Sequence, residues 1–141
     1  MTSPWKVVEI TGETIILYES RTIFRQIFTD GRAFPKDMQP AWQGYSIGRW
    51  DGDTFVVETI GLKDDTWLDL FGTPATGALH VTERFHRLDF GHMDLDITMT
   101  DPKAYSKPWP IKLHLNLMPD AEILEYACME NNRGMEHMVG K

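Results

Sequence analysis

Short runs of alternating apolar and polar residues follow one another along most of the chain. Successive side chains of an extended strand point to opposite faces, so this alternation is typical of strands with one buried face. The clearest run is 93–100, where Met93, Leu95, Ile97 and Met99 alternate with aspartate and threonine. The same reading predicts strands over residues 6–10, 14–19, 21–28, 45–50, 54–60, 79–90, 93–100, 111–118 and 122–129.

A tight turn is predicted at Asp51-Gly52, between two runs rich in aromatic and β-branched residues. Asp-Gly in this setting is a strong signal for a two-residue hairpin, because the central positions of a type I′ turn need positive φ. We therefore expect residues 45–50 and 54–60 to pair as antiparallel strands. Another Asp-Gly pair, at 30–31, ends the strand before them.

Evenly spaced strands with almost no helix predict an all-β fold in a single domain. Antiparallel strands of this kind either close into a barrel or fold as a sandwich. We expect an antiparallel up-and-down, calycin-like barrel of about eight to nine strands over residues 1–130, with a partly ordered tail over 131–141. Residues 34–44 are expected to form a loop, as are residues 61–77, which have room for a short helical turn near 65–71.

Composition excludes several classes of partner and site. The 141 residues carry a net charge of −7, which argues against nucleic acid as a partner, because binding phosphates needs clustered Lys and Arg. No apolar run approaches the roughly 20 residues of a membrane span. The single cysteine, Cys128, rules out an internal disulfide and a cysteine-based zinc cluster. Residues 1–5 lack a basic segment followed by an apolar one, so no signal peptide is expected within this sequence.

The hairpin motif at residues 50–54, Trp-Asp-Gly-Asp-Thr, belongs to a wider pattern. The pattern consists of residues 25–27 with 30–32, 44–54, 82–85, 101–102 and 125–131, and it spans most of the chain from 21 to 131. It resembles a bacterial family of small calycin-like (lipocalin-like) β-barrel proteins. The resemblance implies a barrel, and a periplasmic location if a leader has been removed; otherwise the cytoplasm is expected. Family members often carry Pro-His-Ser where this chain has Pro74-Ala75-Thr76.

Glu83 and Arg25 are predicted to face each other inside the barrel. Glu83 alternates with apolar residues at 81 and 85, and Arg25 alternates with isoleucines at 23 and 27. A carboxylate in a barrel interior costs several kcal/mol unless it is paired. The two side chains therefore form either a pocket acid with a polarising arginine or a structural ion pair between two strands.

Glu58 and Arg84 are further candidates for the catalytic machinery. If Glu58 faced inward, two carboxylates in one desolvated pocket would have separated pKa values and could serve as acid and base. The alternative is that residues 55 and 57 form the inward face, which would leave Glu58 in solvent. Arg84, like Arg25, could stabilise negative charge that develops on a substrate.

Ring-bearing side chains are the candidate ligand-binding groups, since aromatic rings at a barrel mouth can stack on a planar or apolar molecule. They are Tyr18, Tyr45, Trp67, His80, Trp109, His114 and Tyr126. A histidine could instead act as a general base, and the aromatic rings could instead close the core. No residues have the spacing of a known metal site, so neither a metal nor another cofactor is expected.

These features favour an enzyme without a cofactor. It would bind a small hydrophobic or aromatic molecule in the barrel and act by acid–base chemistry, as a lyase or isomerase, because no activated nucleophile is apparent. One alternative is a non-catalytic lipocalin-like carrier with the same pocket. Another is a structural subunit with a solidly packed interior. The sequence leaves a homo-oligomer open.

Overall fold

The computed structural model describes residues 3–64, 67–69 and 71–126. Within these ranges lie eight strands and one short 3-10 helix, η1 (Ser20–Thr22). The strands are β1 (Trp5–Ile10), β2 (Glu13–Tyr18), β3 (Ile23–Phe28), β4 (Tyr45–Asp51), β5 (Thr54–Ile60), β6 (His80–Arg87), β7 (His92–Thr100) and β8 (Trp109–Asn116). They form one sheet in the order of the chain. The predicted all-β fold with little helix is therefore confirmed.

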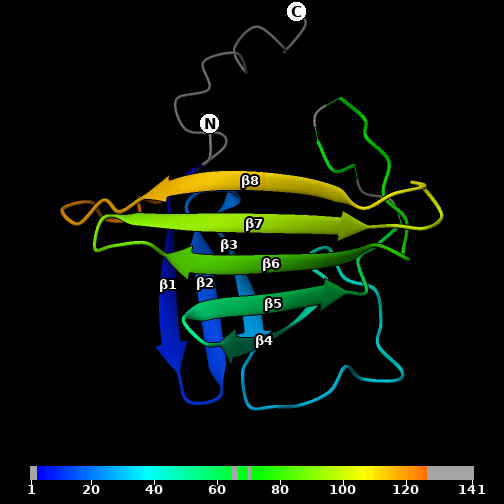
Figure 1. Ribbon diagram of the computed structural model, residues 1–141, viewed down its shortest axis with the longest axis horizontal. Helices are drawn as coiled ribbons and strands as arrows, with labels where there is room; N and C mark the ends of the chain where they lie inside the picture. Colours follow the sequence, from blue (N-terminus) through cyan, green and yellow to red (C-terminus); the bar gives the residue numbers. More distant parts are fainter. Residues whose placement is uncertain (1–2, 65–66, 70, 127–141) are drawn as a thin grey trace, which may run out of the picture.

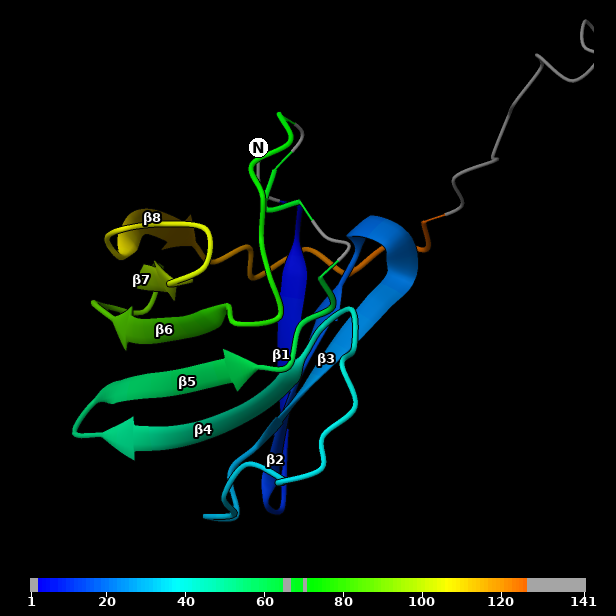
Figure 2. The ribbon, with the colours of Figure 1, turned by 90° about the vertical axis from the view of Figure 1, so that its right-hand side faces the viewer.

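The sheet curls into a half-barrel. Figure 1 shows β4 to β8 stacked side by side, with β1, β2 and β3 crossing them at a steep angle, and Figure 2 shows the bend between the two groups. The strand order gives β1 and β8 no pairing with each other, so backbone hydrogen bonds do not close the ring within the described residues. Pro110 lies in β8 and lacks a backbone N–H, which suits a strand at the edge of a sheet.

The third and fourth strands run parallel, whereas the sequence predicted antiparallel neighbours throughout. They pair only at Ile27 with Ser46 and at Phe28 with Ile47. The connection over residues 29–44 brings the chain back beside the end of β3, so the first residues of β4 run parallel to the last residues of β3. All other neighbouring strands pair in antiparallel fashion.

The central hairpin is present, but its turn differs from the prediction. Asp51 pairs with Thr54, so the two turn residues are Gly52 and Asp53. Gly52 has a φ of 64°, whereas Asp53 does not have a positive φ. Glycine with positive φ at the first central position is typical of a type II′ turn rather than the predicted type I′ turn.

The chain after β8 crosses to the group of strands β1 to β3, and the described part of the predicted ninth strand is not a strand. Residues 121–126 have no regular secondary structure, and residues 127–129 of that predicted strand lie outside the described residues. The backbone N–H of Leu124 donates to the Glu19 carboxylate at 3.1 Å, and the Thr22 hydroxyl donates to the Tyr126 carbonyl at 3.1 Å. This segment therefore crosses from β8 to the η1 corner (orange in Figure 2).

Two other predictions fall partly or wholly outside the described residues. The short helical turn expected near 65–71 includes residues 65, 66 and 70, which are not described, and Trp67 forms an isolated bridge with Pro74. The tail expected over 131–141, and Cys128 before it, also lie beyond the described residues.

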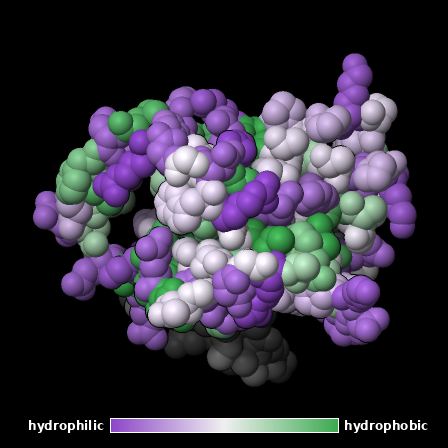
Figure 3. All heavy atoms as spheres, turned by 60° about the horizontal axis from the view of Figure 1, so that its bottom comes forward, coloured by the Kyte–Doolittle hydropathy of each residue, from purple (hydrophilic) through white to green (hydrophobic). Residues whose placement is uncertain are grey.

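The core lies on the inner face of the curled sheet. Ile16, Ile27, Phe55 and Val57 form a buried cluster. The partly buried rings of Trp5, Tyr18 and Phe85 pack against this cluster. We call this side the inner face and the opposite side the outer face. The described residues contain no helix that is long and apolar enough to cross a membrane. On the side presented in Figure 3, polar side chains separate the apolar ones into small groups.

Gly48 allows β4 to pass closely over the core. A Cβ atom at this position would lie 2.6 Å from Phe55 Cζ and 2.8 Å from Ile27 Cγ2. Gly48→Ala is therefore expected to lower the free energy of unfolding by about 1–3 kcal/mol through overpacking, measured by denaturant titration. Gly91→Ala is the control, because its Cβ would meet only Asp89, at 3.7 Å. Equal losses in the two variants would show that close packing at Gly48 is not the cause.

Candidate functional site

Arg25 and Glu83 form a buried ion pair on the inner face, as their strand positions predict. Arg25 Nη2 lies 2.5 Å from Glu83 Oε2, and Nη1 donates to Oε1 at 3.1 Å. The guanidinium also donates from Nε to the Ser46 hydroxyl at 3.0 Å and from Nη2 to the Thr59 hydroxyl at 2.6 Å. Because each charged or polar group has a partner, the network avoids the cost of burying an unpaired charge.

Strand register brings these four side chains together. Ser46 is directly opposite Thr59 in the hairpin of β4 and β5, and their hydroxyls lie 2.9 Å apart. Glu83 is opposite Val57 in the pairing of β5 with β6, so it shares the inner face with that core residue. Arg25 reaches the network from β3, in the other group of strands. The ion pair thus connects the group of strands β1 to β3 with the group β4 to β8.

The charges at this site are fixed by their surroundings. Burial would lower the pKa of Arg25, but the charge and hydrogen bonds of Glu83, together with Tyr18, outweigh burial and raise that pKa. Burial raises the pKa of Tyr18, and the charge and hydrogen bond of Arg25 offset only part of the rise. At neutral pH Arg25 is therefore charged and Tyr18 is a neutral phenol.

A hollow of about 260 Å³ opens on the inner face beside this network. Its lining consists of Ser3, Trp5, Ile16, Tyr18, Glu83, Phe85, Leu95, Leu113 and Leu115. These residues come from β1 and β2 on one side and from β6, β7 and β8 on the other, apart from Ser3, which precedes β1. Most of the lining is apolar, and Tyr18 and Glu83 are its polar strand residues. A smaller hollow of about 210 Å³ lies between β3 and β4, and Arg25 and Ser46 contribute to its lining.

Glu58 and Arg84 lie on the outer face, away from Arg25 and Glu83. The prediction that they form one catalytic site with that pair is therefore wrong. Glu58 is opposite Thr82, one position away from the pairing that places Glu83 inward. Its carboxylate accepts a hydrogen bond from Arg49 Nη1 at 2.6 Å. Arg84 is exposed and donates to Asp51 at 3.1 Å. The face that carries residues 55 and 57 is the buried one, as the alternative prediction held.

The two candidate histidines also lie on the outer face. His80 Nε2 lies 3.7 Å from Glu58 Oε1, and this nitrogen is buried without a hydrogen-bond partner in the part of the chain that the structure describes. His114 Nδ1 lies 2.7 Å from Asp94 Oδ1. Neither imidazole lines the hollow, so neither can act as a base on a molecule bound there.

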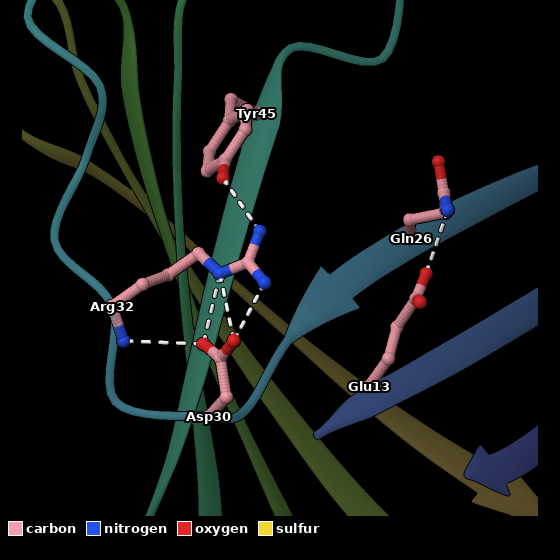
Figure 4. A network of polar contacts seen from close by, with 5 residues as sticks. All are labelled: Glu13, Gln26, Asp30, Arg32 and Tyr45. Atoms are coloured by element: carbon pink, nitrogen blue, oxygen red, sulfur yellow. Dashed lines mark hydrogen bonds and ion pairs between the residues drawn. The ribbon is translucent and has the colours of Figure 1, made fainter. Parts of the chain in front are cut away.

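Tyr45 is held on the outer face by a separate polar cluster (Figure 4). Its ring packs on Phe28 with ring centres 5.0 Å apart. Arg32 donates to the Tyr45 hydroxyl at 3.4 Å and lies over the Phe28 ring, with 4.0 Å between the guanidinium carbon and the ring centre. Arg32 is also paired with Asp30 at 2.6 Å. Tyr45 therefore stabilises the end of β3 rather than the wall of the hollow.

The other three aromatic candidates lie away from the hollow. Trp67 is 73% exposed in the loop between β5 and β6. Trp109 begins β8 on the inner face, where it packs against Tyr105 with ring centres 6.1 Å apart. Tyr126 is 45% exposed near η1. Of the predicted ligand-binding residues, only Tyr18 lines the hollow.

Several residues of the site were not predicted. Ser46 and Thr59 complete the hydrogen bonds of Arg25. A hairpin turn centred on residues 52 and 53 would have placed these two residues opposite each other, but the turn was predicted one residue earlier. Trp5 lines the hollow, but the predicted first strand began one residue later. Leu95, Leu113 and Leu115 carry the alternation that predicted β7 and β8, which could have placed them on the inner face.

Comparison with known proteins does not identify a relative of this chain. No protein-family model, curated protein or solved structure matches the chain.

Proposed function

We propose that the protein binds one small, largely apolar molecule in the hollow on its inner face. The observation that supports this most is the apolar lining of the hollow, in which Ser3, Tyr18 and Glu83 are the few polar residues. Binding sites for small molecules are typically concave and apolar, with a small number of placed polar groups. A volume of about 260 Å³ suits a molecule built on one aromatic ring.

Filling the hollow should abolish this binding. Leu113→Trp replaces an aliphatic side chain in the wall with a larger aromatic one. We expect this substitution to weaken toluene binding at least about tenfold, since the indole ring and toluene would compete for one apolar volume. Lys112→Trp is the matched control, because Lys112 is the adjacent residue on the opposite face, where it pairs with Asp94 at 3.0 Å. Toluene affinity is measured by ligand-detected NMR titration. Equal affinity in the wild type and Leu113→Trp would rule out the hollow as the site.

Acid–base catalysis in the same hollow is the second candidate. It is favoured by the position of Glu83, whose carboxylate lies in the lining beside the neutral phenol of Tyr18. Both carboxylate oxygens already accept hydrogen bonds from Arg25, so proton abstraction would require Arg25 to release one of them. If a substrate is found, Glu83→Gln should lower kcat by at least about 100-fold for a catalytic base. Unchanged turnover in that variant would exclude Glu83 as the catalytic base.

A further inference from the structure

Tyr18 is the residue whose hydrogen bonding is incomplete at this site. Its side chain lies beside Arg25 and lines the hollow. Arginine carries only donors, so Arg25 cannot take the hydroxyl proton of Tyr18. Within the described residues, no side chain or carbonyl takes the hydroxyl proton of Tyr18 in return. That proton therefore remains available to a molecule in the hollow.

The polar side chains of the Arg25 network are already occupied. Arg25 uses four of its N–H groups on Ser46, Thr59 and the two oxygens of Glu83. The Ser46 and Thr59 hydroxyls also contact each other. Beside this network, the Tyr18 hydroxyl is therefore the strand donor of the hollow that keeps its proton for a ligand.

We infer that the bound molecule carries an uncharged hydrogen-bond acceptor, such as a ketone or aldehyde carbonyl, that accepts from the Tyr18 hydroxyl. This inference rests on the proposed binding in the hollow and adds the chemical class of the ligand. The positive charge of the neighbouring Arg25 guanidinium polarises the phenol and makes it a stronger donor. The charges of Arg25 and Glu83 cancel, and the chain has a net charge of −7, so an anionic ligand gains nothing at this site.

A matched series of probes tests the inference. Acetophenone and α-methylstyrene have nearly the same shape, but a carbonyl oxygen in the first is replaced by a methylene group in the second. We expect acetophenone to bind the wild-type protein about 3- to 10-fold tighter, the effect of one hydrogen bond. Benzoate, of similar size but charged, should bind more weakly than acetophenone. Affinities are measured by ligand-detected NMR titration.

Tyr18→Phe removes the donor and keeps the ring. In this variant the preference for acetophenone should disappear or reverse, while α-methylstyrene keeps its wild-type affinity. Infrared spectroscopy provides a measurement that needs no variant: the carbonyl stretch of acetophenone bound to the wild type should lie at lower frequency than in hexane. Circular dichroism confirms that the variant is folded.

The outcomes separate the two proposals. If both probes bind the wild type equally and the carbonyl stretch matches that in hexane, the inference about Tyr18 is overturned while binding in the hollow stands. If acetophenone and α-methylstyrene both fail to bind, or bind equally well to Leu113→Trp, the proposed function fails and the inference fails with it.

Discussion

Glu83→Ala is expected to lower the free energy of unfolding by about 3–5 kcal/mol, because it leaves Arg25 charged and unpaired. The two side chains are only about a tenth exposed, with side-chain exposures of 9% for Arg25 and 11% for Glu83. Solvent therefore cannot replace the lost carboxylate without opening the sheet. Chemical denaturation of the variant and the wild type measures the difference.

Two controls identify the cause of this loss. Arg84→Ala removes the neighbouring, exposed side chain, whose pair with Asp51 should contribute less than about 1 kcal/mol. The double variant Arg25→Met with Glu83→Leu removes both charges and keeps an apolar volume, and it should recover most of the lost stability. Ser46 and Thr59 already contact each other at 2.9 Å, so we expect both hydroxyls to keep a partner in that variant. A loss below about 1 kcal/mol for Glu83→Ala would contradict a desolvated pair.

Asp101→Ala is expected to cost roughly 3 kcal/mol, because a buried carboxylate that caps two loops is lost. Asp101 is 2% exposed. It accepts from the Thr76 backbone N–H at 2.7 Å, the Thr76 hydroxyl at 2.9 Å and the Lys103 backbone N–H at 3.1 Å. Asp96→Ala is the control, since that carboxylate is half exposed and lies 3.5 Å from Lys112. Comparable losses in both variants would contradict a special role for Asp101.

The contribution of Asp101 should also depend on pH. Burial would raise the pKa of this carboxyl, but the hydrogen bonds from Thr76, Lys103 and Ala104 outweigh burial and lower it. A group with a lowered folded-state pKa stabilises the fold above its unfolded value of about 3.9, and this stabilisation is lost as pH falls through the folded-state pKa. The stability difference between the wild type and Asp101→Ala should therefore shrink below about pH 4. A difference that stays constant from pH 7 to pH 3 would exclude linkage to this carboxyl.

Alternation of apolar and polar residues was sufficient to predict most strands and the contact between Glu83 and Arg25. Both side chains lie between apolar neighbours at spacings of two, so each had one defined face. The same reasoning left the orientation of Glu58 open, because Phe55, Val56 and Val57 are all apolar and buried, so alternation does not mark one face of the strand. A strand buried on both faces carries no signal for its orientation.

Topology and the full lining of the hollow depended on long-range geometry. Nothing in residues 29–44 distinguishes a loop that returns the chain for a parallel pairing from one that leads to an antiparallel neighbour. The hollow collects Trp5 from β1 and Leu113 from β8, strands at opposite ends of the sheet. Their proximity follows from the curl of the whole sheet, which local sequence patterns do not specify.

Methyl NMR with toluene tests the central claim most directly, because it reports which side chains the ligand touches. The hollow contains methyl groups of Ile16, Leu95, Leu113 and Leu115, whereas Leu17 and Leu88 are exposed elsewhere. Binding in the hollow predicts saturable shifts of the first four residues, with Leu17 and Leu88 unchanged. Shifts confined to Leu17 and Leu88, or no saturable shift at all, would contradict it.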